Sequence, residues 1–161
     1  MASQLQLAAQ FPPVKILPAA SDAAGRTGAW ASLRNALKAW LVCEVNQGNA
    51  ANVALSVLQA KDINGTGSKA ISVAAPIWLN NATGSSDALA QLASATSFTT
   101  DATLADKLVV FEIQPEDALD LANGFNHITV QTGASNAANV TSVTLHVWGS
   151  YQGATPPSTM V

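Results

Sequence analysis

Two histidines, one cysteine and one small group of acids are the side chains in this sequence that could do chemistry. A hydrolase triad needs a nucleophile, a base and an orienting acid, and only His127 and His146 could supply the imidazole base. Neither histidine lies in a catalytic motif. The sequence contains no Gly-x-Ser-x-Gly elbow, and no glycine loop in the strand–turn–helix context that phosphate binding needs. The sequence therefore predicts no enzyme and no cofactor.

The two histidines would approach each other if residues 127–132 and 141–148 formed a hairpin across 133–140. His127 and His146 would then lie on the face opposite the large aliphatic side chains of their strands. Two imidazoles can bind a metal, but the sequence offers no third ligand, and paired solvent-facing histidines are far commoner than metal sites. No metal site is predicted.

Cys43 is the only cysteine, so an intrachain disulfide and a thiolate metal cluster are both excluded. It lies in the β-rich run 40–45, where a buried thiol behaves as a small apolar residue. A reactive thiolate would need a nearby cation, and no histidine or lysine stands beside it in sequence. Cys43 is therefore interpreted as a core residue.

The acids gather around a predicted strand end and turn; they are Glu112, Glu116, Asp117 and Asp120. Paired carboxylates can perform glycosidic acid–base chemistry when one of them is buried and its pKa is raised. They could also bind calcium, or simply be solvated on a turn. The solvated turn is the favoured interpretation.

Composition limits the classes of partner. The chain has 161 residues, of which 48% are hydrophobic and only 11% charged, against a usual charged share of about 25%. Disorder needs high charge and low hydrophobicity, so one folded domain is expected. Seven scattered basic residues against ten acids predict no nucleic-acid partner. No run approaches about 18 apolar residues and residues 1–9 lack a basic signal-peptide region, so no membrane partner is predicted.

The elements that must position these side chains are short β-branched runs separated by glycine- and asparagine-rich joints. The predicted strands are 37–45, 53–59, 71–73, 108–113, 127–132 and 141–148. In the last of them Val143, Leu145 and Val147 face one way and the intervening residues the other. Helix is expected only as short turns at 86–92 and 115–119. These patterns predict an all-β fold, an antiparallel β-sandwich or jelly-roll-like domain.

One pentapeptide occurs twice, as residues 49–53 and 136–140, and each copy opens a predicted strand. The flanking residues are not similar enough to indicate a duplicated half-sheet. We interpret the two copies as similar entries from a loop into a strand.

The predicted domain organisation is an extended N-terminal arm at 1–29, a β-sandwich at 30–151 and a C-terminal tail at 152–161. Prolines favour extended backbone in the arm, and residues 21–28 have the composition of a linker. The arm is expected to be mobile when free and ordered against a partner. The residues proposed for that partner contact are Phe11, Val14, Ile16, Leu17 and Trp30.

Several segments between Leu33 and Tyr151 resemble small head-decoration (cement) proteins of tailed bacteriophages and prophages. Their motifs are structural turns and strands without a catalytic signature. The segments are 33–36, 45–55, 65–71, 98–101, 107–113 and 132–136.

The resemblance implies a β-rich protein on the outer surface of a phage capsid, made in the cytoplasm of the bacterial host. Its partners would be the major capsid protein, whose subunits it bridges, and itself as a homotrimer. It implies no active site and no cofactor. Two alternatives stay open: another phage structural part, such as tail tube or baseplate, and a carbohydrate-binding β-sandwich module that uses Trp78 or Trp148.

Overall fold

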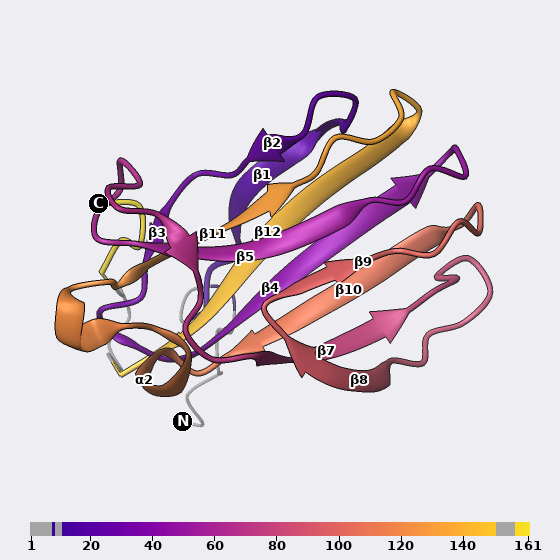
Figure 1. Ribbon diagram of the computed structural model, residues 1–161. Helices are drawn as coiled ribbons and strands as arrows, with labels where there is room; N and C mark the ends of the chain where they lie inside the picture. The colour runs from indigo at the N-terminus through magenta and orange to yellow at the C-terminus, as the bar shows by residue number, and fades with distance from the viewer. Residues whose placement is uncertain (1–7, 9–10, 151–156) are drawn as a thin grey trace.

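Two antiparallel sheets packed face to face form the protein (Figure 1). The structure is a computed structural model that describes residue 8 and residues 11–150 and 157–161. The first sheet has the strand order β1-β12-β4-β10-β7-β8, and the second has β2-β11-β5-β6 with β3 and β9 paired at its margins. The predicted all-β sandwich is confirmed.

The first sheet consists of β1 (Val14–Ser21), β4 (Ala36–Gln47), β7 (Ala75–Asn80), β8 (Ala90–Ala95), β10 (Asp106–Ile113) and β12 (Asn139–Gly149). The second consists of β2 (Arg26–Thr27), β3 (Ala31–Ser32), β5 (Ala54–Ala60), β6 (Lys69–Ala70), β9 (Ser97–Thr99) and β11 (His127–Thr132). One helical turn, α2 (Pro115–Ala118), and a short 3-10 turn at Leu121–Asn123 follow β10. A turn was predicted at 115–119, and α2 confirms it.

Alternation of side chains along the strands explains why these residues form a sandwich. In β4, Leu41, Cys43 and Val45 are fully buried, whereas Trp40 and Val42 point to the opposite face. Such a period of two places one face of the strand against the other sheet.

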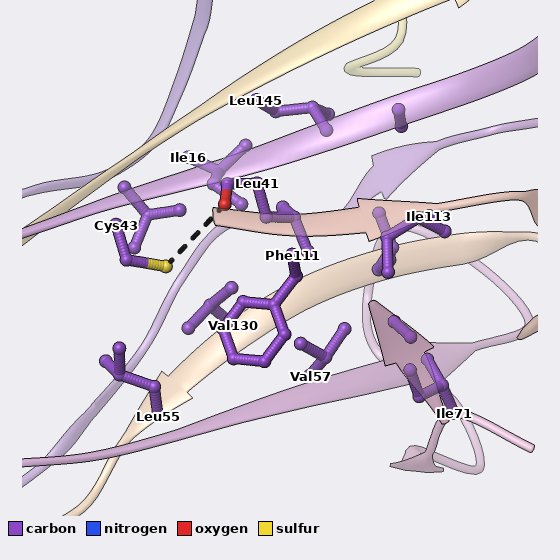
Figure 2. Packing of buried hydrophobic residues seen from close by; sticks show 14 of the residues in the cluster. Ile16, Leu41, Cys43, Leu55, Val57, Ile71, Phe111, Ile113, Val130 and Leu145 are labelled. Atoms are coloured by element: carbon purple, nitrogen blue, oxygen red, sulfur yellow. Dashed lines mark hydrogen bonds between the residues drawn. The ribbon is translucent and has the colours of Figure 1, made fainter. Parts of the chain in front are cut away.

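The core lies between the two sheets and is built around Phe111. Figure 2 shows its ring between Leu41 on the first sheet and Val57 and Val130 on the second. All four side chains are completely buried. Burying one such side chain contributes roughly 1.5–3 kcal/mol, so this layer is the main source of stability.

Most connections pass from one sheet to the other, including β4 to β5, β10 to β11 and β11 to β12. The hairpin of 127–132 with 141–148, which would have brought the two histidines together, therefore does not form. β11 pairs with β5, whereas β12 pairs with β4 through eleven residue partners. Local turn composition cannot distinguish a hairpin from a connection between sheets.

The segment 86–92 was expected to start a helix, and this is also wrong. Residues 90–95 form β8, the edge strand beside β7. Pairing with β7 overrides a weak helix propensity, which tertiary context commonly does. Residues 71–73 are not a strand, and β7, which carries Pro76, was not predicted.

The predicted arm at 1–29 requires the largest correction, because its described part belongs to the sandwich. Residues 14–21 form β1, which pairs with β12. Ile16 is 1% exposed and Leu17 is 3% exposed, and both lie in the core cluster. Pro18 is tolerated because β1 is an edge strand with bulges, where a missing N–H breaks no ladder. The boundary at residue 29 is therefore wrong; residues 1–7 and 9–10 lie outside the described residues.

The C-terminal tail predicted at 152–161 lies partly outside the described residues, which resume at 157. There the Ser32 N–H of β3 donates a hydrogen bond of 2.6 Å to the Thr159 carbonyl. The end of the chain therefore contacts the sandwich.

The two copies of the repeated pentapeptide meet at one end of the sandwich. Asn49 and Asn136 each accept a hydrogen bond from the N–H two residues further on, at 2.9 Å. Asn139, buried in the second copy, accepts from the Asn49 N–H and donates to the Ala51 carbonyl. The two similar loop-to-strand segments predicted from the sequence therefore also form hydrogen bonds with each other.

Candidate functional site

The five residues proposed for partner contact do not form one surface. Ile16 and Leu17 are core residues and are not available to a partner. Phe11, Val14 and Trp30 are half-buried. Trp30 packs on the loop at Gly65, whose positive φ of 79° suits a glycine and leaves no room for a Cβ beside the indole.

An apolar hollow of about 200 Å³ lies at one end of the first sheet, beside Val14. Pro12, Ala36, Val147 and Met160 also line it. No titratable side chain lines this hollow, so it offers packing surface and no acid–base chemistry.

The two histidines lie on different sheets. His127 on β11 is buried, and desolvation lowers its pKa, which favours the neutral imidazole. His146 on β12 faces outward and is half-buried beside Trp40. In the described residues no group of three or more histidine, cysteine or acidic side chains could hold a metal ion.

Cys43 is completely buried in the core, as Figure 2 shows. Desolvation raises the pKa of its thiol well above the usual value. Because thiolates are the reactive form, this cysteine packs as an apolar side chain, as predicted.

The acids at 112–120 separate into two groups. Glu112, Glu116 and Asp117 line a shallow hollow beside Pro76, and Glu112 also pairs with Lys38 at 2.8 Å. Asp120 lies apart and pairs with Lys69 at 2.6 Å. Hydrogen bonding to Lys69 lowers the pKa of Asp120. A general acid needs a raised pKa, so Asp120 is a solvated, ionised carboxylate.

Lys107 forms an internal polar site that the sequence did not indicate. Its side chain is completely buried near the start of β10. The ammonium donates to Asp101 Oδ1 at 2.7 Å, to the Asp101 carbonyl at 2.9 Å and to Gln47 Oε1 at 3.0 Å. All three donor positions are used, so Lys107 fastens the 100–106 loop to β4 and is not free to act on a substrate.

This lysine should make the stability depend on pH. Hydrogen bonds from Lys107 and then from Asn81 hold the pKa of Asp101 far below its usual value of about 3.9. A lowered pKa in the folded state adds stability above pH 4, and that stability is lost as the pH falls below 4. We expect Lys107→Met to reduce the free energy of unfolding by about 1–3 kcal/mol at pH 7, and to flatten its decline between pH 5 and pH 2.

Urea unfolding at several pH values measures both effects, with Lys61→Met at an exposed lysine as the control. If the free energy of unfolding fell equally steeply with decreasing pH in the wild type and in Lys107→Met, the contact with Asp101 would not be the cause of the acid sensitivity.

The most distinctive surface is the outer face of the first sheet. Three of the four tryptophans lie on this face, Trp40 on β4, Trp78 on β7 and Trp148 on β12. Trp148 is 43% exposed, and the other two are half-buried.

Aliphatic side chains fill the space between the tryptophans. In the strand register Val110 lies between Val42 on one side and Trp78 on the other. Leu108 extends the apolar surface along β10. We call the surface formed by Trp40, Val42, Trp78, Leu108, Val110 and Trp148 the tryptophan face.

The outer face of the second sheet is different in kind. Its outward positions carry Thr27, Ser56 and Gln131, and the Gln131 amide donates to the Thr27 hydroxyl at 3.0 Å. This part of the face is polar and solvated, whereas Leu58, Thr129 and His127 occupy the same face further along, where Thr129 and His127 are buried. The tryptophan face is therefore a particular property of the first sheet.

One signal in the sequence pointed to this surface. The run 108–113 is apolar on both faces apart from Glu112, which predicted a central or doubly covered strand. The second sheet covers the inner face of β10, and on its outer face Val110 is only 9% exposed between Val42 and Trp78.

The described residues contain no helix long and apolar enough to span a bilayer. No protein-family model matches the sequence, and no curated protein is significantly similar to it. The fold is similar to the crystal structure of the SPBc2 prophage-derived protein YomS, with a TM-score of 0.50 and 9% sequence identity. The match covers 85% of this chain and 92% of that chain, so the two proteins share their fold over most of their length.

Proposed function

We propose that this protein is a structural component of a tailed-phage virion that decorates and stabilises the outside of the capsid by bridging major capsid subunits. The observation that carries the proposal is the fold shared with a prophage-derived protein over 85% of the chain. The resemblance of residues 33–151 to head-decoration proteins supports the same assignment. No chemistry is needed for this role, since attachment depends on surface contact alone.

The proposed mechanism is a mechanical clamp. A protein that binds only the assembled lattice stabilises it by mass action, by about 2.7 kcal/mol per site at a hundredfold excess over Kd. Repeated over many sites, this contribution would raise the resistance of the shell to heat and internal pressure. Because only 11% of the residues are charged, we expect attachment to depend weakly on salt.

The test uses heads assembled from the major capsid protein of the same phage or prophage, with and without this protein. We expect the decorated heads to melt several degrees higher, at both low and high ionic strength. His146→Ala is a suitable control variant, because its imidazole is assigned no chemistry. Equal melting temperatures with and without the protein would contradict the clamp, and release at moderate salt would contradict attachment by apolar contact.

Two other functions predict different experimental results. A tail-tube or baseplate component would be found in purified tails and would not bind heads. The three outward tryptophans favour a carbohydrate-binding module, since indole rings stack on sugars. Such a module would be retained on an insoluble polysaccharide, and Trp148→Ala would abolish the retention.

The resemblance also implies that the protein associates with itself as a homotrimer, although the clamp does not depend on the number of copies that associate. Symmetric assembly would cover apolar surface that a single copy exposes. The contact through which copies meet is a separate question.

A further inference from the structure

We propose that the tryptophan face is the surface through which two copies of this chain pack against each other, sheet on sheet. This inference goes beyond the proposed function, because it concerns the protein alone in solution. If the protein does not form this dimer, the proposed attachment to heads still stands. If the protein does not bind heads, the proposed dimer still stands.

The composition of the face is that of a protein interface. Interface cores are enriched in aromatic side chains and poor in charge, with a polar rim. Here Trp40, Val42 and Val110 occupy the middle of the sheet, and Lys15 and Gln91 lie toward its edges on β1 and β8. Lys38, Glu44 and Glu112 lie toward the ends of the two central strands, β4 and β10. Tryptophan is also among the side chains that contribute most to binding.

The area of the whole outer face of the first sheet matches what a stable dimer requires. Six strands spaced about 4.8 Å apart span roughly 29 Å, and the eight-residue ladder of β4 with β10 extends roughly 26 Å. The whole outer face of the first sheet, of which the tryptophan face is the central part, therefore measures roughly 750 Å². This is close to the 800 Å² or so that each partner buries in a standard interface.

Charges on this face are already paired within each copy. Lys38 binds Glu112 at 2.8 Å. Lys15 donates to the Ser142 hydroxyl at 3.4 Å, and that hydroxyl donates to Glu44 at 2.8 Å. The two lysines thus balance the two glutamates. A second copy meets no excess of like charge here, although the whole chain carries a net charge of -3.

A flat face that packs against the same face of another copy forms an isologous contact, which closes at two copies. The two sheets would lie about 10 Å apart, as in ordinary sandwich packing. This arrangement differs from the homotrimer that the resemblance implies. The aliphatic side chains between the tryptophans favour protein over sugar as the occupant, because a sugar requires polar partners for its hydroxyl groups.

Analytical ultracentrifugation between about 1 and 100 µM tests the proposal. We expect the wild type to sediment at twice the 16.5 kDa mass of one chain. Val42→Arg places a charge in the middle of the face and should weaken the dimer at least 100-fold. Thr144→Glu is the second variant; Thr144 lies opposite Val42 and beside Lys15, so the new carboxylate gains a cation and the fold is retained.

Gln131→Arg on the outer face of the second sheet is the matched control, and it should leave the dimer intact. Circular dichroism melting confirms that each variant is folded. A wild type that stays monomeric, a trimer, or a dimer that survives both face variants would overturn the proposal.

Tryptophan fluorescence gives an independent measurement. Dilution of the wild type should increase quenching by iodide as Trp40 and Trp78 become accessible, whereas Thr144→Glu should show high quenching at every concentration. Trp30 lies against Gly65 and away from this face, so it contributes a constant background. Quenching that does not depend on concentration, or protection by an added polysaccharide instead of by a second copy, would also overturn the proposal.

Discussion

Asp22→Ala is expected to lower the free energy of unfolding by about 3–5 kcal/mol, the largest effect of any single substitution considered for this protein. The Asp22 side chain is completely buried and pairs with Arg26 at 3.0 Å. It also accepts a hydrogen bond from the Thr141 hydroxyl on β12. Its removal leaves the Arg26 guanidinium largely buried without a counter-ion.

The guanidinium would still hold its backbone partners after this substitution, the carbonyls of Pro18, Ala20 and Thr141 at 2.7–2.8 Å. These contacts connect Arg26 on β2 to β1 and β12. We therefore expect the lower stability of Asp22→Ala to appear as unfolding of the whole sandwich in one transition. A stability of 5–15 kcal/mol is typical of a domain, so the variant would lose a large share of it.

Urea unfolding measures this effect, and Asp120→Ala provides the control because the Asp120–Lys69 pair lies at the surface. We expect the control to change stability far less, since exposed ion pairs contribute little. A loss in Asp22→Ala no larger than in Asp120→Ala would show that residues 18–26 are not structurally coupled to β12.

Ile16→Ala is expected to lower the free energy of unfolding by about 2–5 kcal/mol, because it removes a core side chain that is only 1% exposed. The neighbouring Lys15 faces outward on the same strand. Lys15→Ala should therefore change stability by less than about 0.5 kcal/mol. Thermal unfolding distinguishes the two, since about 1 kcal/mol shifts Tm by about 2–4 °C in a chain of this length.

These two variants test whether residues 14–21 belong to a mobile arm, as the sequence indicated, or to a core strand, as in the structure. A mobile arm would make Ile16→Ala and Lys15→Ala equally harmless to folding. A core strand requires Ile16→Ala to be severe and Lys15→Ala to be mild. Similar melting temperatures for the two variants would contradict the placement of β1 in the first sheet.

Strands could be predicted wherever a local pattern was sufficient. The runs 37–45, 53–59, 108–113, 127–132 and 141–148 all correspond to strands, because side chains on a strand alternate between a core and another surface. The sandwich followed from the number of such runs and the turns between them. The buried role of Cys43 followed in the same way.

Strand partners could not be predicted, because pairing depends on residues far apart in the sequence. The joint 133–140 has the composition of a hairpin turn, yet it connects two different sheets, so His127 and His146 do not meet. For the same reason β8 was mistaken for a helical turn: only its pairing with β7 makes residues 90–95 extended.

The sequence by itself determined an all-β chain with little charge, one buried cysteine and no motif for catalysis, because composition and alternation are local properties. The tertiary structure alone decided that residues 14–21 complete the first sheet, since only pairing with β12 turns a proline-containing segment into an edge strand. It also decided that Trp40, Trp78 and Trp148 share one outer face. A sequence pattern distinguishes the two faces of a strand, but only the position of the second sheet determines which of them is left for a partner.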